Sequence, residues 1–376
     1  FDTTLRDGEQ SAGVCFSAAD KVEIASQLAA MRVDVIEAGF PASSEAESEA
    51  VAAVARAVRG ATVCALARAV SGDVDAAAHA LRHAERARIH VFVSVSEVHL
   101  AHQLRKGREP VLRMADACVR RARQRVPEVE FSPMDATRAD PSFIAEIVRV
   151  ALAAGAGTIN LPDTVGYALP EGVAQMIREL RARVPEVEDA VISFHGQNDL
   201  GLATANALAA VGAGARQVEL AVNGIGERAG NTSFEETVMA LRVHGAALGV
   251  YTDVDPSGIY ALSKCVEQRS GLRVAHNKAI VGRNAFRHAS GIHQDGVLKR
   301  RETYELIDPK QIGHPTGSEI VLGKLSGRAG FDARVRGIGI ELRGAAFESA
   351  FQRFQDLAER VPEVRDEDLR ALCTGA

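Results

Sequence analysis

Short runs rich in β-branched residues recur along the first 250 residues of this chain, each followed by a stretch of helix-forming residues. We expect eight strands, over Phe1–Asp7, Val33–Phe40, Thr62–Ala67, Ile89–Ser96, Val129–Asp135, Thr158–Thr164, Val191–Asp199 and Gln217–Glu227. Helical patterns such as Ala18–Met31 and Ala203–Gly212 separate them, at a period of about 30 residues. Eight such units predict a (β/α)8 TIM barrel, an α/β fold. A doubly wound sheet is the alternative, but it usually has a glycine-rich phosphate turn after its first strand, and none follows here.

The alternation ends after Leu248. A linker, a helix, a loop-rich stretch and a helical tail are expected over Tyr251–Pro256, Gly258–Ser270, Val274–Pro315 and Ile320–Arg360. We therefore predict a barrel domain over residues 1–250, followed by a linker and a small, mostly helical C-terminal subdomain over residues 251–376.

Composition excludes several classes of protein. The 376 residues have a net charge of −5 and no long basic run, so nucleic acid is not an expected partner. No apolar run is long enough to cross a membrane and no signal peptide is recognisable, which predicts a cytoplasmic protein. The five cysteines lack CxxC spacing, which argues against a zinc knuckle and against a disulfide framework.

In a barrel of this kind the functional residues lie at the C-terminal ends of the strands. Polar and charged residues gather at those predicted ends, while the strand interiors read as apolar. The first predicted strand ends in Arg6 and Asp7, a pair suited to a substrate that carries a carboxylate and binds a divalent metal. A surface ion pair in a turn is the alternative interpretation.

Asp7, His195 and Asn231 are candidate ligands of one divalent cation, because a carboxylate, an imidazole and an amide oxygen suit a metal with positions open for substrate. Taken alone, His195 would more often be a hydrogen-bonded histidine at a strand end. The loop Gly224–Asn231 is rich in glycine, so its backbone can approach a ligand closely, although a plain turn would have the same pattern.

Two residues beyond the barrel are candidates for proton transfer. His293 lies in Ser290–Gly296 and Tyr304 in Glu302–Tyr304, within a stretch dense in polar side chains. They could move protons if this region covers a barrel mouth. Packing between domains is the alternative.

Several motifs together resemble the DRE-TIM metallolyase family, and within it the branch of the 2-isopropylmalate and homocitrate synthases. The matching segments are Thr4-Leu-Arg-Asp-Gly-Glu-Gln10, Ile36-Glu-Ala-Gly-Phe-Pro-Ala-Ser43, Asn160-Leu-Pro-Asp-Thr-Val-Gly-Tyr167, Asn223-Gly-Ile-Gly-Glu-Arg-Ala-Gly-Asn231, Asn277-Lys-Ala-Ile-Val-Gly282 and Ser290-Gly-Ile-His-Gln-Asp-Gly296. They occur in order from residue 1 to about Arg328, which makes the resemblance specific.

The resemblance implies a metal-dependent acyltransferase that condenses acetyl-CoA with a 2-oxo acid and then hydrolyses the thioester. It implies catalysis by Arg6, His293 and Tyr304, substrate binding by Arg6, Gln10, Glu37, Leu66, Ser94, Met134 and Thr164, and a divalent metal cation (Mg, Mn, Zn or Co) on Asp7, His195, Gln197 and Asn231. It also implies a homodimer in which His293 and Tyr304 reach the partner's active site. No leucine-binding regulatory domain is expected within the 376 residues.

Two departures from the family pattern affect the expected substrate. Gln197 stands where the family usually has the second histidine of His-x-His, and Met134 stands where relatives usually carry a glutamate. Leu66 and Met134 favour an apolar side chain, such as that of 2-oxoisovalerate, because a buried distal carboxylate would cost several kcal/mol beside them. Homocitrate synthase, a related 2-alkylmalate or phosphonomethylmalate synthase, an acyl-CoA lyase and a catalytically silent barrel stay as alternatives.

Overall fold

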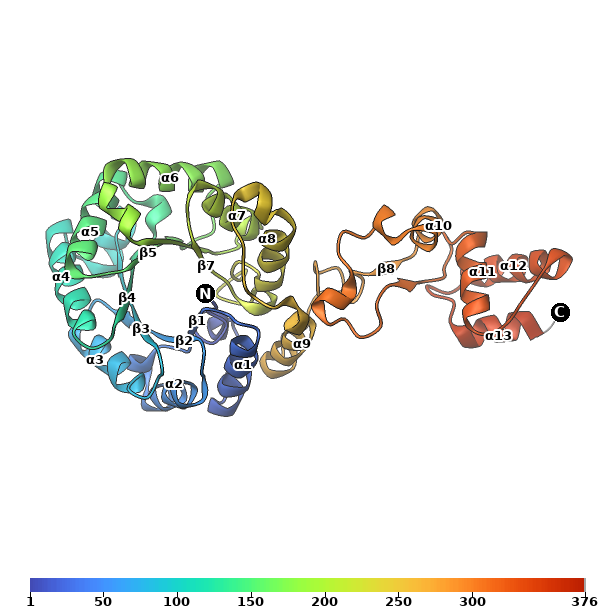
Figure 1. Cartoon of the computed structure of the whole chain (residues 1–376), viewed down its shortest axis with the longest axis horizontal. Helices are drawn as coiled ribbons and strands as arrows, with labels where there is room; N and C mark the ends of the chain where they lie inside the picture. The colour runs from blue at the N-terminus through green and yellow to red at the C-terminus, as the bar shows by residue number, and fades with distance from the viewer. Residues whose placement is uncertain (375–376) are drawn as a thin grey trace. The chain divides into compact units, whose positions relative to one another are not determined.

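The computed structural model describes residues 1–374, and the chain forms two compact units, Phe1–Arg273 and Val274–Ala376. The first unit is a ring of parallel strands surrounded by helices (Figure 1). Its strands are β1 (Val35–Glu37), β2 (Thr62–Arg68), β3 (Ala87–Ser94), β4 (Glu128–Met134), β5 (Thr158–Asp163), β6 (Val191–Gly196) and β7 (Gln217–Glu219). Its α-helices are α1 (Ala18–Ala30), α2 (Glu45–Ala57), α3 (Ser71–Ala80), α4 (Arg108–Arg123), α5 (Pro141–Ala154), α6 (Pro170–Arg183), α7 (Ala203–Ala213), α8 (Phe234–Leu248) and α9 (Ile259–Ser270).

The N-terminal segment closes the barrel. Asp2 forms parallel bridges to Ile36 of β1 and to Leu220 just after β7. The Asp2 N–H donates to the Val35 carbonyl at 2.8 Å, and the Thr3 N–H donates to the Leu220 carbonyl at 2.8 Å. The predicted eight-stranded α/β barrel is therefore confirmed, with Phe1–Thr3 in the place of a full first strand.

Seven of the eight predicted strands were too long at their C-terminal ends, the first and the last of them by the most. The strand predicted over Phe1–Asp7 ends at Thr3, because the amides of Arg6 and Gly8 both turn back to the Thr3 carbonyl. The strand predicted over Gln217–Glu227 is regular only over Gln217–Glu219 and then gives way to single bridges and a 3-10 turn. Both ends are turns because the chain bends there to bring side chains to the barrel mouth.

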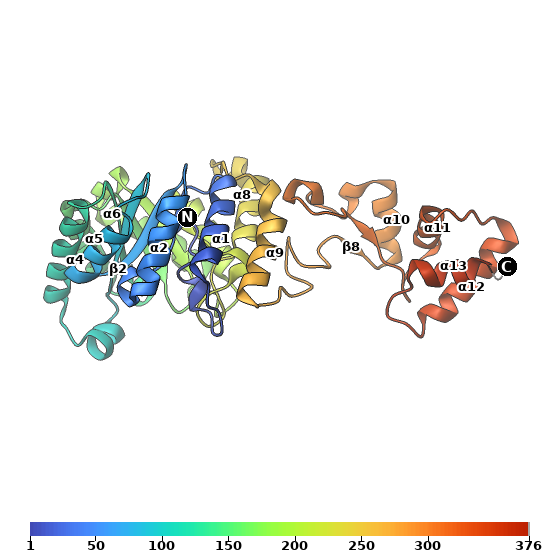
Figure 2. The same cartoon turned by 90° about the horizontal axis from the view of Figure 1, so that it is seen from below.

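Local sequence explains where the helices begin and end. Ser17 and Asp20 form a capping box at the start of α1. Asp140 caps α5 ahead of Pro141, and Gly155 ends that helix in the left-handed conformation. Figure 2 shows α1 between α2 and α9 on the outside of the barrel, and α1 contacts both.

The sequence predicted apolar strand interiors, and this prediction was wrong. The interior of the barrel contains buried charged residues. Glu130 is fully buried and accepts hydrogen bonds from Arg88 at 3.0 Å and from Gln217 at 2.7 Å. His90 and Glu219 are also buried there. These strands look apolar in sequence because charged residues occupy only alternate positions, and pairing between strands compensates their charges.

The second unit contains a small parallel sheet and a helical bundle. Its elements are β8 (Arg287–His288), α10 (Gly291–Lys299), β9 (Glu319–Ile320), α11 (Arg328–Gly337), α12 (Gly344–Ala358) and α13 (Asp366–Thr374). Phe331, Phe351 and Phe354 form the centre of the bundle core. Residues 251–273, which the sequence grouped with the C-terminal part, lie in the first unit, where α9 contacts α1.

No helix among the described residues is long and apolar enough to span a bilayer.

Candidate active site

A pocket of about 320 Å³ opens at the C-terminal ends of the barrel strands. It is lined by Arg6, Asp7, Gln10, Leu66, His90, Phe92, Gln103, Ser132, Met134, Asn160, Pro162, Thr164, His195, Gln197, Glu219, Glu227 and Arg228. Many of the residues that the sequence singled out thus share one pocket, although they come from different strand ends.

Asp7 is the centre of a buried polar cluster. Its side chain is only 6% exposed, and its Oδ2 lies 3.7 Å from Nε2 of His195. Asn231 donates to Asp7 Oδ1 at 2.9 Å, and Gln197 Nε2 lies 3.3 Å from both carboxylate oxygens. Burial alone would raise the pKa of Asp7, but the positive charges of Arg6 and His195 and the bonds from Asn231 and Gln197 hold it below its usual value.

Glu219 orients the imidazole of His195. The Nδ1 of His195 lies 2.8 Å from Glu219 Oε2, which directs Nε2 toward Asp7. Burial lowers the pKa of His195, but the bond and charge of Glu219 outweigh it and raise the pKa. A carboxylate behind a histidine is the arrangement that orients metal-binding histidines.

The cluster fits a divalent cation. The amide oxygens of Gln197 and Asn231 are buried without a hydrogen-bond partner in the described part of the chain. Buried polar atoms rarely stay unpaired, so these two oxygens point to a ligand. In this structure the amide nitrogens of Gln197 and Asn231 face Asp7. With each amide turned so that its oxygen takes that place, Asp7, His195, Gln197 and Asn231 offer three oxygens and one nitrogen, which suits a hard or borderline divalent metal.

Two other groups of buried side chains lie deeper in the barrel, Glu37 with Cys64 and His90, and His90 with Glu130 and Glu219. Both ring nitrogens of His90 are already hydrogen bonded, to Glu37 at 2.8 Å and to Ser132 at 2.6 Å. These groups are therefore better explained as ion-pair networks than as metal sites.

Arg6 is anchored from behind by Glu37. Its Nε donates to Glu37 Oε2 at 2.6 Å and its Nη1 to Asp7 Oδ2 at 2.7 Å. Its side chain is 11% exposed, so the pair is not a surface ion pair. Within residues 1–374, Nη2 has no hydrogen-bond partner, which leaves it free to donate to a substrate oxygen.

Glu37 in turn holds His90. Burial alone would raise the pKa of Glu37, but the positive charges of Arg6 and His90 lower it. Burial alone would lower the pKa of His90, but its bond to Glu37 raises this pKa to about 9. Arg6, Glu37 and His90 therefore form one charged network beneath the pocket.

Apolar side chains and the hydroxyl of Thr164 also line the pocket. Leu66 and Met134 line it. The hydroxyl oxygen of Thr164 accepts from the Asp135 N–H at 2.9 Å, so its own proton can be donated to a substrate carboxylate. Ser94 does not line the pocket but donates to Gln103, which does, at 2.9 Å. Gln10 lies at the exposed rim.

Gly226 brings the loop after β7 against the cluster. A Cβ atom at Gly226 would lie 2.1 Å from Nδ2 of Asn231 and 3.1 Å from Oδ1 of Asp7. Arg228 in the same loop is not simply solvated, because it pairs with Asp199 at 2.8 Å and donates to the Thr164 carbonyl at 2.8 Å. The glycine pattern therefore allows close packing around Asp7.

In the second unit, His293 and Tyr304 lie next to each other. Their rings stack with centroids 4.0 Å apart and planes 21° apart. His293 is exposed and Tyr304 is 44% exposed. The structure thus brings these two predicted residues together, with both rings accessible.

Comparison with known proteins gives a consistent result. Residues 1–266 match the HMGL-like family model, and residues 280–362 match the homocitrate synthase post-HMGL domain-like model. A 2-isopropylmalate synthase of Nitrosococcus oceani is 53% identical over 100% of this chain and 74% of its own length. The chain belongs to the 2-isopropylmalate synthase family. Another member, from Syntrophus aciditrophicus, is 51% identical over 99% of this chain and 72% of its own length.

Solved structures extend the fold comparison beyond the 2-isopropylmalate synthase family. The HMG-CoA lyase of Bacillus subtilis has a TM-score of 0.61 at 22% identity, over 72% of this chain and 93% of that one. An HMG-CoA lyase of Acinetobacter baumannii, solved with coenzyme A and 3-methylmalate, has a TM-score of 0.60 at 20% identity. The match covers 71% of this chain and 89% of that one. At this identity the likeness concerns the barrel fold alone.

Several residues that line the pocket were not predicted from the sequence. They are Phe92, His90, Gln103, Ser132, Asn160, Pro162 and Glu219. Most lie at alternate positions of strands whose ends had been singled out, and parallel register pairs Leu66 with His90 and His195 with Glu219. Reading every second residue backward from each strand end would have found the residues in the strands, but not Gln103, which lies in the turn His99–Leu104 after β3.

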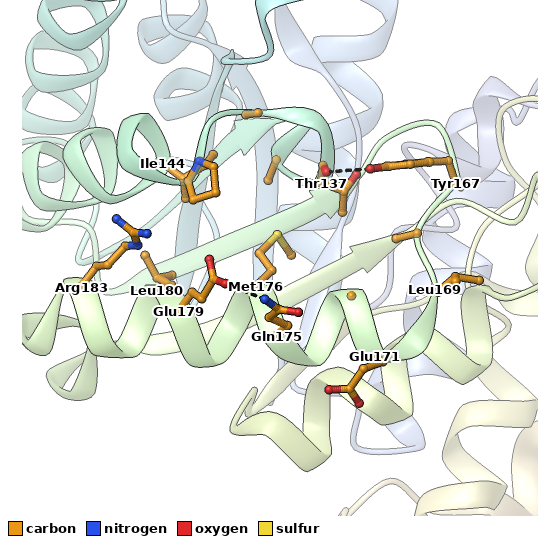
Figure 3. A pocket seen from close by; sticks show the side chains of 15 residues that line it. Thr137, Ile144, Tyr167, Leu169, Glu171, Gln175, Met176, Glu179, Leu180 and Arg183 are labelled. Atoms are coloured by element: carbon orange, nitrogen blue, oxygen red, sulfur yellow. Dashed lines mark hydrogen bonds between the residues drawn. The ribbon is translucent and has the colours of Figure 1, made fainter.

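A second hollow, of about 560 Å³, lies on the outer wall of the barrel. Figure 3 shows Gln175, Met176 and Leu180 of α6 beside it, with Ile144 of α5 opposite. The residues that line it include none of the site residues predicted from the sequence.

Proposed function

We propose that this protein is a metal-dependent acyltransferase that condenses acetyl-CoA with 2-oxoisovalerate, giving 2-isopropylmalate and CoA. One observation carries the proposal: Arg6, Asp7 and His195 share a pocket with Leu66 and Met134. The 53% identity to a 2-isopropylmalate synthase over the whole chain supports the same reaction.

A divalent cation, Mg, Mn, Zn or Co, would be held by Asp7, His195, Asn231 and Gln197. When bound, it supplies a Lewis acid that polarises the keto group of the 2-oxo acid. The unpaired amide oxygens of Gln197 and Asn231 support this ligand set. An amide oxygen is a weaker ligand than imidazole for a borderline metal, so Gln197 favours harder ions.

The chain's own residues orient the 2-oxo acid. The Thr164 hydroxyl donates to the substrate carboxylate, and the free Nη2 of Arg6 donates to the keto oxygen. As charge develops on that oxygen, a fixed guanidinium stabilises it without reorganising. Glu37 keeps Arg6 in place through the 2.6 Å bond to its Nε.

His293 and Tyr304 move the protons. One of the two removes a proton from the acetyl methyl group, so that its carbon bonds to the keto carbon, and the other gives a proton to the resulting alkoxide. Water then cleaves the thioester, which releases the CoA thiol and a carboxylate. The 4.0 Å stacking of the two rings supports a joint role.

We also propose that the enzyme is a homodimer in which His293 and Tyr304 of each subunit serve the barrel of the other. The stacked rings are accessible, with Tyr304 44% exposed, as that arrangement requires. The five cysteines are free in the described part of the chain, which suits the reducing cytoplasm where we propose that the enzyme works.

Leu66 and Met134 support a branched apolar acid rather than an acidic one. A distal carboxylate, as in the homocitrate synthase reaction, would meet these two side chains and His90. Both nitrogens of His90 are already hydrogen bonded, to Glu37 and to Ser132, so His90 has no free donor for this carboxylate. An unpaired buried carboxylate is costly.

A thiol-release assay with acetyl-CoA tests the substrate. We expect kcat/KM for 2-oxoisovalerate to exceed that for 2-oxoglutarate by at least about 100-fold, which corresponds to about 3 kcal/mol. A preference for an acidic or phosphonate-bearing 2-oxo acid would contradict the proposed substrate. Release of acetyl-CoA from a hydroxyacyl-CoA would indicate a lyase, and no turnover with any acid in metal-supplemented protein would indicate a silent barrel.

A further inference from the structure

Lys21 of α1 is the one lysine in the described chain among its largest fully buried side chains. Its ammonium group lies within hydrogen-bond distance of five oxygen atoms. Two belong to Glu47, at 2.7 and 2.8 Å, and one to Glu9, at 2.7 Å. The other two are the backbone carbonyls of Leu5 at 3.1 Å and Ala38 at 3.3 Å.

The two carbonyls flank the residues that make the site. Leu5 directly precedes Arg6, and Ala38 directly follows Glu37. Arg6 and Glu37 are joined by the 2.6 Å bond that anchors the guanidinium. Lys21 therefore ties together the two backbone segments whose separation determines this bond.

The carboxylates of Glu9 and Glu47 connect Lys21 to two further backbone segments. Glu9 also accepts from the Phe16 N–H at 2.9 Å, and Glu47 accepts from the Phe40 N–H at 3.0 Å. Gly39 makes room for Glu47, because a Cβ atom there would lie 1.9 Å from Glu47 Oε1. Lys21 thus joins the turn that carries Asp7, the end of β1, and the start of α2.

Stability alone does not explain a buried lysine here. Replacing a buried ion pair with neutral groups of similar volume is often neutral or stabilising, whereas removing one partner is costly. What an ammonium adds is several directed donors on one atom, which can hold two carbonyls and two carboxylates in a defined arrangement.

We propose that Lys21 is a positioning residue, which sets the place of Arg6 and Asp7 at the barrel mouth by clamping the carbonyls of Leu5 and Ala38. The inference rests on the roles given to Arg6 and Asp7 in the proposed function. Lys21 is too deeply buried to touch substrate and acts only through these residues.

The test compares Lys21→Met with the double variant Lys21→Met/Glu47→Gln. The double variant removes the charges of Lys21 and Glu47 and keeps an amide oxygen that can accept from the Phe40 N–H. Lys264→Met is the control, because Lys264 forms a 2.7 Å pair with Glu267 on a partly exposed face of α9, away from the residues of the pocket. Tm by circular dichroism, Mn²⁺ binding by electron paramagnetic resonance, and kcat and KM are measured for each full-length protein.

We expect Lys21→Met to lose both Tm and activity. The double variant should recover most of the Tm, yet keep kcat and Mn²⁺ affinity at least about tenfold below wild type, as positioning residues around metal ligands do. KM for acetyl-CoA should change little in the double variant. The control should match wild type in all four measurements.

A double variant with wild-type Tm, kcat and Mn²⁺ affinity would overturn the inference. If neither Lys21 variant folds, Glu47→Gln alone is used: a lower kcat at unchanged Tm supports the clamp, and an unchanged kcat overturns it. Asp7→Ala separates the two proposals, because equal Mn²⁺ binding by wild type and Asp7→Ala would instead refute the metal site.

Discussion

At the scale of single residues, Gln197 is the feature that most distinguishes the proposed metal site. Its amide lies 3.3 Å from both oxygens of Asp7 and 3.2 Å from Nε2 of His195, while its own oxygen is unpaired. An amide can turn either its oxygen or its nitrogen toward the cluster. Gln197 therefore has the reach of a ligand, but less intrinsic affinity than histidine.

Substitutions of Asp7 and of Gln197 should have opposite effects on metal binding. Asp7→Ala removes the only carboxylate ligand, so metal-dependent turnover should be lost. Gln197→His should tighten binding of Zn²⁺ or Co²⁺ by about tenfold or more, because imidazole is the better ligand for these ions. Thiol release measures the turnover of Asp7→Ala, and isothermal titration calorimetry measures the metal affinity of Gln197→His. An unchanged metal affinity in Gln197→His would place Gln197 outside the ligand set.

At the scale of elements, the turns at the strand ends matter more than the strands themselves. The segment after Phe1–Thr3 and the loop after β7 both leave regular structure within a few residues of the barrel edge. The first brings Asp7 to the pocket, and the second brings Asn231 against it. The site is thus assembled by backbone turns that approach each other closely.

Gly226→Ala tests this close approach. The added methyl group would lie 2.1 Å from Asn231 Nδ2, so Asn231 must move away from Asp7. We expect a loss of about 1 to 3 kcal/mol in the free energy of unfolding and weaker Mn²⁺ binding. Gly212→Ala is the control, since its Cβ would meet nothing nearer than 3.8 Å on an exposed face of α7. It should be neutral or stabilising by about 1 kcal/mol. Equal Mn²⁺ affinity in both variants would argue against the role of the glycine.

At the scale of the whole molecule, the barrel is held by a charged interior as well as by an apolar core. His90, Glu130 and Glu219 lie close together inside the ring, with Arg88 and Glu37 beside them. Burial raises the pKa of Glu130, whereas the bond to Glu37 raises that of His90 to about 9. The stability of the barrel should therefore depend on pH.

The sign of this dependence follows from His90. Its pKa is about 9 in the folded chain and about 6.5 when unfolded, so the folded state holds the proton more tightly. The stabilisation that protonated His90 gives the folded state is therefore complete below pH 6.5 and is lost as the pH rises through 9. The free energy of unfolding should fall by up to about 3 kcal/mol over this range. Urea unfolding between pH 6.5 and 9.5 measures it, with His90→Asn expected to show a shallower decline. Parallel curves for the two proteins would contradict the assignment.

The proposed sharing of active sites between two subunits gives a second prediction at this scale. Asp7→Ala and His293→Ala homodimers should both be inactive. A heterodimer of one subunit of each, co-expressed with two affinity tags, has one intact site and should regain about half of the wild-type activity. Recovery is measured by thiol release after tandem purification. An inactive heterodimer would mean that each subunit uses its own His293.

The strand ends could be predicted from the sequence because the alternation of strands and helices is a local pattern. Asp7, His195 and Gln197 were found in this way, and Arg6 with them. His90 was missed because it lies within β3 and its partner Glu37 is 53 residues away. Lys21 was missed because a lysine in a helix is normally solvated, and only the fold brings five oxygens around it.

By itself, the sequence determined the barrel, the family and the residue types at the mouth, since periodicity and ordered motifs are properties of the chain. Only the tertiary structure decided that the interior is charged, that Glu37 anchors Arg6 and that the amide oxygens of Gln197 and Asn231 are left unpaired. These depend on the register in which distant strands pair, and this register determines which charges are buried together.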